Sequence, residues 1–458
     1  MVVGGTPRVN RRVTRASVFA AVAALAVLAP ALGDAAAVPF LAVAGVVLLG
    51  IREGEWFETL ALPGDREAER LYGLGAFALG LAGLAAFATL PRVPLPFGAF
   101  AAASLAVGGG RLGRALFARQ FDGEFELVGG YLLVASTAAI AGQVAVGLVG
   151  SDLSPSELVS VGPLAGTLPV FVFLAAVAAL TAGLVRSLVY ARDEHITVVV
   201  VALVVWGFMG LEPTVSAGGI VAGLAVTVAL GYISYALGTA SVPGMLTGVL
   251  LALLTVVLGG VGWFLTLMGF YAVGGLASKY RFDEKAERGV AQENQGARGT
   301  GNVLANSAVA LVALLGYAAT GHVEVPPALF GLAFGGAIAT AMADTLSSEI
   351  GGLFDGPRLI TTLRPVEPGT DGAITWQGEL AGGAGAAVVA AIAAVGIPIG
   401  DPLVGGAVVF LAGVVGMTVD SLLGALIEGE RVGNQAVNFL ATLSGALVAV
   451  ATGGLFLG

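Results

Sequence analysis

Four polar stretches in the second half of the sequence hold residue types that bind phosphates and metal ions. The first is rich in basic residues and amides: Lys279, Lys285, Arg298, Asn302 and Asn306. Basic side chains beside glycine-rich backbone suit a polyphosphate, because lysine offers a point charge and arginine a bidentate fork. An ordinary cytoplasmic loop with internal ion pairs is the alternative. The amides favour a site, since amides in a helix that enters lipid need partners.

The second stretch, AMADTLSSEIGG, ends an apolar run and places carboxylates and hydroxyls one helical turn apart. Asp344 precedes Ser348 by four residues, and Thr345 precedes Glu349 by four. Such groups at a membrane edge hold Mg²⁺ together with substrate phosphates. The alternative is a plain helix end, in which the hydroxyls bond back to the helix backbone. Two carboxylates so close to a lipid-length run are unfavourable without a role, which favours a metal site.

The third stretch is a turn rich in glycine after two arginines. Its candidate residues are Arg358, Gly369, Thr370, Asp371 and Gly372. Successive backbone N–H groups in such a turn form an anion-binding nest, and the Thr and Asp side chains add metal contacts. Taken alone, the turn favours the structural interpretation, in which it caps the next helix.

The fourth stretch contains an aspartate inside an apolar run. Asp420 lies two helical turns before Glu428, and Ser421 and Asn438 are further polar groups at membrane depth. An ionisable residue within a membrane span marks a functional site by default. The competing interpretation is a structural hydrogen bond to a neighbouring helix.

The elements that carry these residues are membrane helices. Of 458 residues, 57% are hydrophobic and 11% are charged, against about 25% charged in soluble domains. The apolar runs reach about 20 residues, enough to cross a bilayer as helices. They are continuous, whereas outer-membrane barrels alternate apolar and polar residues. The chain lacks Cys and holds two His, so oxygen ligands and Mg²⁺ are favoured over zinc. A net charge of −9 argues against nucleic acid as a partner.

The runs predict an all-α, polytopic helix bundle with about 15 transmembrane helices. The basic clusters, Arg92 apart, fall on the side of the N-terminus, so the positive-inside tendency predicts a cell-membrane protein with its N-terminus and site loops in the cytoplasm. Residues 1–195 form an extension of about six helices without catalytic spacing and without an assigned role. Residues 196–458 form the domain that carries the site.

The topology places all four stretches at cytoplasmic helix ends. This convergence predicts one site with carboxylates, basic residues and glycine turns. Mg²⁺-dependent phosphoryl or nucleotidyl transfer suits such a site, since the protein there mainly positions groups and neutralises charge. A lipid is the expected acceptor, because the bilayer forms the remaining wall.

The strings SKYRFDEK with NVLANS, ADTLSSEIG, EPGTDGAITWQG and DSLLGALIEG with NFLATLSG appear in this order. They resemble the signature blocks of the transmembrane protein 19 family, also called domain-of-unknown-function family 92, which includes the plant phytyl-phosphate kinases. The resemblance covers about 196–458. It implies a CTP-dependent kinase that converts an isoprenyl monophosphate of the phytyl or geranylgeranyl type into the diphosphate.

The resemblance also implies roles for the residues above. The string around Asp344 is similar to the metal-site region of polyprenol kinases and CDP-diacylglycerol synthases. On that analogy Asp344 holds Mg²⁺, Asp371 and Asp420 complete the metal shell, and the basic loop holds phosphates. The full prediction makes Asp344, Asp371 and Asp420 catalytic and adds Glu349 as a metal ligand. Its substrate-binding or nucleotide-binding residues are Lys279, Lys285, Arg298, Asn302, Asn306, Ser348, Arg358, Gly369, Thr370, Gly372 and Asn438.

A transporter or lipid-handling protein without covalent chemistry is the alternative function. Many helices and abundant glycine suit it. Such a protein would place polar residues near the bilayer midplane at broken helices. Here the polar residues crowd toward one face, and Glu212-Pro213 is better interpreted as an outside turn than as a break.

Overall fold

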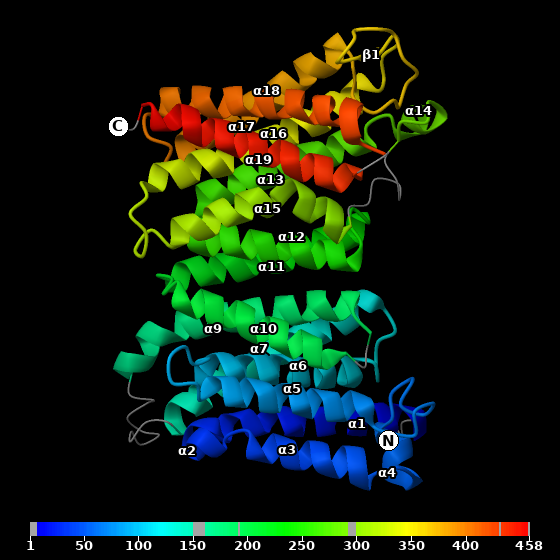
Figure 1. Ribbon diagram of the computed structural model, residues 1–458, viewed down its shortest axis with the longest axis vertical. Coiled ribbons are helices and arrows are strands. Elements are labelled where there is room, and N and C mark those ends of the chain that lie inside the picture. Colours follow the sequence, from blue (N-terminus) through cyan, green and yellow to red (C-terminus); the bar gives the residue numbers. More distant parts are fainter. Residues whose placement is uncertain (1–6, 150–160, 191–192, 292–298, 430–431, 457–458) are drawn as a thin grey trace. The chain divides into compact units, whose positions relative to one another are not determined.

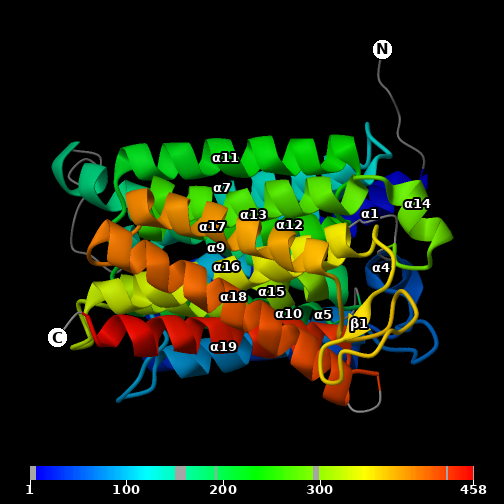
Figure 2. The same cartoon turned by 90° about the horizontal axis from the view of Figure 1, so that it is seen from above.

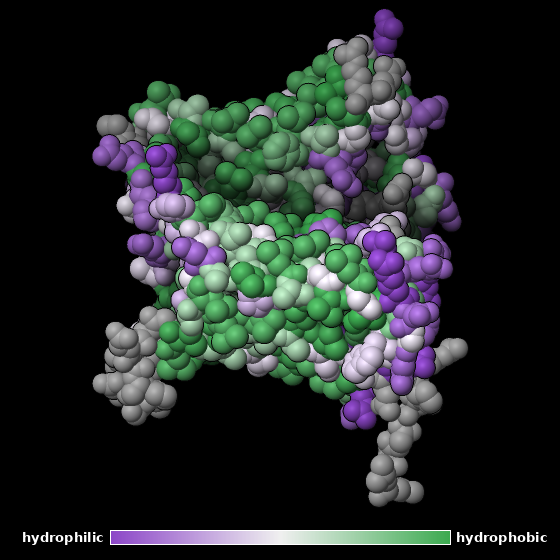
Figure 3. Space-filling view, turned by 60° about the horizontal axis from the view of Figure 1, so that its bottom comes forward, coloured by the Kyte–Doolittle hydropathy of each residue, from purple (hydrophilic) through white to green (hydrophobic). Residues whose placement is uncertain are grey.

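The structure, a computed structural model, describes residues 7–149, 161–190, 193–291, 299–429 and 432–456. Nearly all regular structure is helical, and Figure 3 shows apolar side chains over the helix midsections with hydrophilic ones toward the helix ends. Eleven helices of the described part are long and apolar enough to cross a membrane, and three shorter apolar helices accompany them. The prediction of an all-α, polytopic membrane protein is confirmed, whereas the count of about 15 spans stays a prediction.

The chain divides into two compact units, residues 1–220 and 221–458. The helical segments of the first unit are, in order (Figure 1), α1 (Pro7–Ala24), η1 (Leu25–Leu28), α2 (Ala29–Leu32), η2 (Gly33–Ala35), α3 (Val38–Gly45), η3 (Val46–Gly50), α4 (Gly54–Leu60), α5 (Tyr72–Ala88), α6 (Phe97–Phe117), α7 (Glu124–Val149), α9 (Val161–Leu188) and α10 (Glu194–Gly210).

Helix α10 belongs to the first unit, because it packs against α5, α6 and α9. An ion cluster fixes the start of this helix. The buried carboxylate of Glu194 accepts hydrogen bonds from both Arg111 and Arg186. The guanidinium of Arg111 also lies 3.8 Å from the ring centre of Phe19. A buried carboxylate is tolerated when it is paired in this way, and the pairing ties α10 to α6 and α9.

The second unit carries all four polar stretches. Its elements are α11 (Ala217–Leu237), which crosses the boundary between the units, α12 (Val242–Leu254), η4 (Thr255–Gly259), α13 (Val261–Lys279), α14 (Phe282–Glu287), α15 (Thr300–Ala318), α16 (Pro327–Gly351), β1 (Arg358–Leu359), β2 (Ala373–Ile374), α17 (Trp376–Gly396), α18 (Pro402–Ile427) and α19 (Asn434–Gly454).

Helix α16 is the centre of this unit and packs against α13, α15, α17, α18 and α19 (Figure 2). Small residues allow the close packing, as is usual between membrane helices. Where α13 crosses α17, a Cβ added to Gly262 would lie 1.8 Å from the carbonyl oxygen of Gly396, so only glycine fits. Near the same crossing, the rings of Trp263 and Phe334 pack with centres 4.7 Å apart.

The polar ends of these helices are gathered at one end of the unit. In Figure 1, α14 and β1 lie at that end, and α19 finishes at the other. The α16–α17 connection there forms a small antiparallel ribbon, in which Arg358 pairs with Ile374 and Leu359 with Ala373. Helices α16 and α18 therefore end, and α15, α17 and α19 begin, near one another.

Candidate active site

A polar cavity of about 210 Å³ lies at this end of the second unit. Its walls come from the starts of α15 and α19, the ends of α16 and α18, and the turn before β2. The lining residues are Asn302, Asn306, Asp344, Thr345, Ser347, Ser348, Thr370, Asp371, Gly372, Ala373, Asp420, Ser421, Gly424, Glu428, Asn434 and Asn438.

The structure brings together most of the residues that the sequence singled out. The predicted residues that line this cavity are Asn302, Asn306, Asp344, Ser348, Thr370, Asp371, Gly372, Asp420 and Asn438. They come from all four polar stretches, which are up to 136 residues apart in sequence (from 302 to 438).

Sequence reasoning left Thr345, Ser347, Ser421, Glu428 and Asn434 out of the predicted set, although they line the same cavity. A repeated pattern would have found two of them. Helices α15 and α19 both begin with the pattern G-N-x-x-x-N, and α16 and α18 both carry D-[ST]-L before their ends. When the two copies of each pattern are aligned, Ser421 corresponds to Thr345 and Asn434 corresponds to Asn302. The alignment therefore points to Ser421 and Asn434 as cavity residues.

Two pairs of carboxylates face this cavity. The side chains of Asp344 and Asp420 share a hydrogen bond, and Oδ1 of Asp420 is buried without a hydrogen-bond partner among the described residues. Glu428, just beyond the end of α18, lies near Asp371. Burial raises the pKa of Glu428, the negative charge of Asp371 raises it further, and a hydrogen bond with Asn434 opposes both.

The cavity carries four carboxylates, and no Lys or Arg of the described chain lines it. An anionic substrate can enter such a field only with cations that offset the charge. The donors also suit Mg²⁺, which binds through one or two carboxylates plus phosphate oxygens and water. No three carboxylate or imidazole groups of the described residues converge as ligands. Asp344 and Asp420, with the unpartnered Oδ1, therefore fit a Mg²⁺ ion whose remaining ligands come from a phosphate.

A larger cavity of about 1020 Å³ adjoins the first. The residues that line both are Asn302, Ser347, Ser348, Thr370, Asp371, Ala373 and Asn434. Glu349 and Gly369 line the larger cavity only. Two adjoining spaces that share polar residues can hold two parts of one substrate, or two substrates with their reactive groups in contact.

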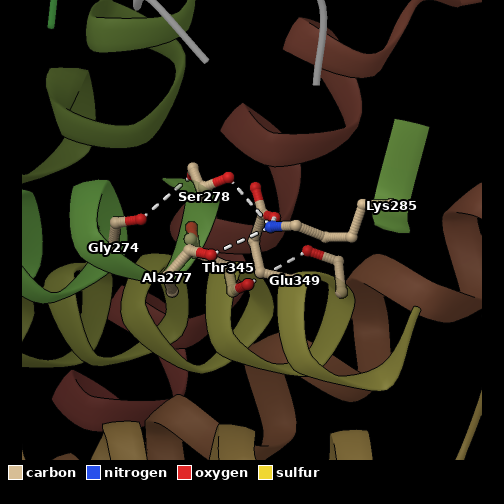
Figure 4. Close-up of polar contacts among 7 residues, drawn as sticks. Gly274, Ala277, Ser278, Lys285, Thr345 and Glu349 are labelled. Atoms are coloured by element: carbon tan, nitrogen blue, oxygen red, sulfur yellow. Dashed lines mark hydrogen bonds and ion pairs between the residues drawn. The ribbon is translucent and has the colours of Figure 1, made fainter. Parts of the chain in front are cut away.

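The basic residues lie elsewhere (Figure 4). Lys285 is buried and donates to the carboxylate of Glu349 at 2.5 Å and to the carbonyl oxygens of Ala277 and Ser278, each at 2.9 Å. Because Glu349 is buried against this ammonium and does not line the polar cavity, we leave it out of the Mg²⁺ site.

The remaining predicted phosphate ligands are also directed away from both cavities or lie outside the described residues. Lys279 donates to the carbonyl oxygen of Leu237, and Arg358 donates to that of Leu363. Neither lines a cavity. Arg298 falls outside the described residues. Amides and hydroxyls, rather than basic groups, are thus the described donors around the polar cavity.

The turn that presents Asp371 depends on two glycines. Gly369 and Gly372 have φ angles of +82° and +73°, and Thr370 bonds back to the carbonyl oxygen of Glu367 through its N–H and its hydroxyl. Gly372 also lies against α18, where an added Cβ would be 2.5 Å from the carbonyl oxygen of Ser421. The absence of a side chain therefore brings the turn close to the Asp420 helix.

We expect Gly372→Ala to lower the free energy of unfolding by about 2–4 kcal/mol, because a positive φ and a steric clash each contribute about 1–2 kcal/mol. The change should also weaken the binding of Mn²⁺, which serves as a probe for the Mg²⁺ site, since Asp371 and α18 are pushed apart. Thermal unfolding in detergent and Mn²⁺ titration measure the two effects. The matched control is Gly383→Ala in α17, where an added Cβ meets nothing within 4 Å. Equal behaviour of the two variants would contradict the prediction.

Comparison with known proteins places this unit in a family. A family model described as integral membrane protein DUF92 matches residues 225–446, nearly the whole second unit. An uncharacterized membrane protein of Methanocaldococcus jannaschii is 34% identical over 203 residues, which cover 42% of this chain and 76% of the relative. One of Synechocystis is 31% identical over 197 residues, covering 42% and 74%.

A plant relative adds to these matches. The Arabidopsis thaliana protein named "Protein VTE6, chloroplastic" is 31% identical over 216 residues, 46% of this chain and 64% of the relative. No solved structure matched. The family model and the coverage of the prokaryotic relatives agree with the resemblance found in the sequence, and the chain belongs to the integral membrane family DUF92.

Proposed function

We propose that this protein is a membrane kinase that transfers the γ-phosphoryl group of CTP to an isoprenyl monophosphate, forming the diphosphate. The phosphate group of a phytyl-type or geranylgeranyl-type lipid would enter the polar cavity from the bilayer. The protein would lie in the cell membrane, and the cavity would open to the cytoplasm. This proposal is supported by membership of DUF92, because the signature blocks of the chain resemble those of a family that includes the plant phytyl-phosphate kinases.

The observation that carries the proposal is the charge of the polar cavity. Four carboxylates with no described basic residue would repel a bare phosphate, so substrates must arrive with a divalent cation. Donor and acceptor phosphates held through such a cation can come together despite their charges. Transfer between two phosphates needs little more than this positioning and neutralisation.

Named residues divide this work. Asp344 and Asp420 would hold Mg²⁺, which when bound supplies neutralisation of the charge on the transferring phosphoryl group. The amides of Asn302, Asn306 and Asn438 would donate hydrogen bonds to phosphate oxygens, which fixes the direction of attack. The acceptor phosphate is already ionised at neutral pH, so no side chain has to remove a proton from it.

An apolar surface beside the cavity would suit the lipid tail. On α18, Leu422 and Leu426 are 36% and 68% exposed. Ser421, which precedes Leu422, and Gly424, which lies between the two leucines, line the cavity. One helix thus presents polar groups to the cavity and apolar side chains outward. An isoprenyl chain lying against this outer face would keep its phosphate within reach of the carboxylates.

The test is phosphoryl transfer from γ-labelled CTP to geranylgeranyl or phytyl monophosphate by the full-length protein, purified in detergent with Mg²⁺. We expect label in the isoprenyl diphosphate and none when EDTA is present. Folded protein that binds Mn²⁺ but transfers no label from CTP or ATP would overturn the proposal. Nucleotide-independent flux of a substrate in proteoliposomes would then favour the transporter alternative.

A further inference from the structure

One residue that lines the larger cavity, Glu349, carries a buried carboxylate oxygen for which the described residues offer no hydrogen-bond donor. Glu349 is only 3% exposed, and its Oε1 is buried without a partner among the described residues. The other oxygen, Oε2, receives the ammonium of Lys285. A buried acceptor without a partner is unfavourable, so such atoms in native sites commonly await a ligand donor.

Lys285 pairs with this carboxylate and fixes its orientation. Its ammonium donates to Ala277, Ser278 and Glu349, which accounts for all three of its protons. Figure 4 shows Lys285 approaching the carboxylate from one side, with the second oxygen directed away from it. A metal cation is a poor occupant next to Oε1, because it would face the ammonium. A neutral N–H donor is compatible with both charges.

The other walls suit a flat ring. Glycines form much of them, which leaves backbone rather than side chains at the surface: Gly289, Gly299, Gly301, Gly351, Gly352 and Gly433. Phe354 lines the same cavity and is 39% exposed, so its ring is available for stacking. Among the described residues that line the polar cavity there is no aromatic and no large apolar side chain. The larger cavity therefore offers backbone and an aromatic ring, which suit a nucleotide base, whereas the polar cavity offers the groups that suit phosphates with a cation.

We infer that the larger cavity binds the base of the nucleotide and that Glu349 selects a base with an exocyclic amine, such as cytosine, over uracil. The inference rests on the proposed function for the nucleotide itself. A carboxylate accepts a hydrogen bond from the amine of cytosine, whereas uracil presents a carbonyl oxygen at that position, which the carboxylate repels. Stacking on Phe354 adds affinity that does not depend on the base. The phosphates then reach the polar cavity past Ser347, Ser348 and Asp371, which line both spaces.

The test is equilibrium competition of unlabelled CTP and UTP against labelled CTP on the full-length protein in detergent with Mg²⁺. We expect the affinity for CTP to be at least about tenfold higher than the affinity for UTP, because one hydrogen bond to a charged group provides a difference of this size. In Glu349→Gln the amide oxygen should face Lys285, which turns the amide N–H₂ toward the cavity. The donor then matches uracil, and the CTP-to-UTP affinity ratio should fall about 10- to 100-fold, to about one or lower.

Two further variants separate selection from general damage. Glu379→Gln changes another carboxylate with a buried unpartnered oxygen, but Glu379 lines neither cavity, so the ratio should stay as in the wild type. Phe354→Ala should weaken both nucleotides alike. These measurements, with the wild-type ratio, decide the matter if Glu349→Gln fails to fold.

A wild-type ratio near one, or a ratio unchanged in folded Glu349→Gln, would overturn the base assignment and leave the proposed kinase standing. Affinity for both nucleotides unaltered by Phe354→Ala would likewise contradict the placement of the base. A wild-type protein that binds Mn²⁺ and no nucleotide at all would overturn both the inference and the proposed function.

Discussion

Asp344→Asn is expected to lower phosphoryl transfer by at least about 100-fold while the protein still folds. Asp344 contacts Asp420 in a cavity that is lined by four carboxylates and by no described basic group. Replacing it removes one of two carboxylate ligands that we assign to Mg²⁺, and losing one electrostatic partner of a transition state lowers rates by about 10²–10³. Folding should survive, because asparagine has the same shape and relieves repulsion among the remaining carboxylates.

Initial rates and Mn²⁺ binding, followed by electron paramagnetic resonance, check the two parts of this prediction. Asp401→Asn is the matched control, since Asp401 lies at the opposite end of the Asp420 helix. Its carboxylate caps that helix by accepting from the N–H groups of Leu403 and Val404, each at 3.0 Å. Asparagine caps helices equally well, so both activity and stability should be kept. A wild-type rate in Asp344→Asn would remove Asp344 from the mechanism.

The sequence alone predicts the helices and most of the polar cavity. Long apolar runs leave little choice of structure, because a bilayer accepts only segments whose backbone groups are satisfied internally. Polar residues at the ends of such runs must find partners, and helices that return to the same side place those ends together. Asp344, Asp371, Asp420 and Asn438 were predictable for this reason, although they lie on different elements.

Charge pairs between distant segments could not be predicted in this way. Arg111 and Arg186 belong to the basic clusters that are expected on the cytoplasmic side. Both bind the buried carboxylate of Glu194, which is 83 residues beyond Arg111. Lys285 is a second case. Positive charge beside a glycine-rich loop predicts a phosphate ligand, but the geometry of α13 and α16 supplies three protein acceptors instead. A basic residue takes whichever partner the packing brings to it.

Lys285→Met is expected to lower the free energy of unfolding by about 3–5 kcal/mol, the usual effect of removing one partner from a buried ion pair. Lys285 is 1% exposed, and its loss removes a donor from the carboxylate of Glu349 and from the carbonyl oxygens of Ala277 and Ser278, of which Ala277 keeps the N–H of Tyr280. The ammonium also joins α14 to the ends of α13 and α16. Thermal and SDS-induced unfolding of the purified protein measure the loss.

The double variant Lys285→Met/Glu349→Leu distinguishes pairing from a general effect of mutation in this region. It removes both charges together, so no uncompensated carboxylate remains, and replacing a buried pair by apolar groups is often close to neutral. We expect it to recover most of the stability that the single variant loses. A double variant as unstable as the single one would mean that the two α13 carbonyl groups, rather than Glu349, are what Lys285 stabilises. A single variant as stable as the wild type would contradict the buried pair. Glu349 lies one helical turn after Thr345 on α16. Thr345 lines the polar cavity and Glu349 lines the larger one, so the position of the Lys285–Glu349 pair also sets where the end of α16 meets both cavities.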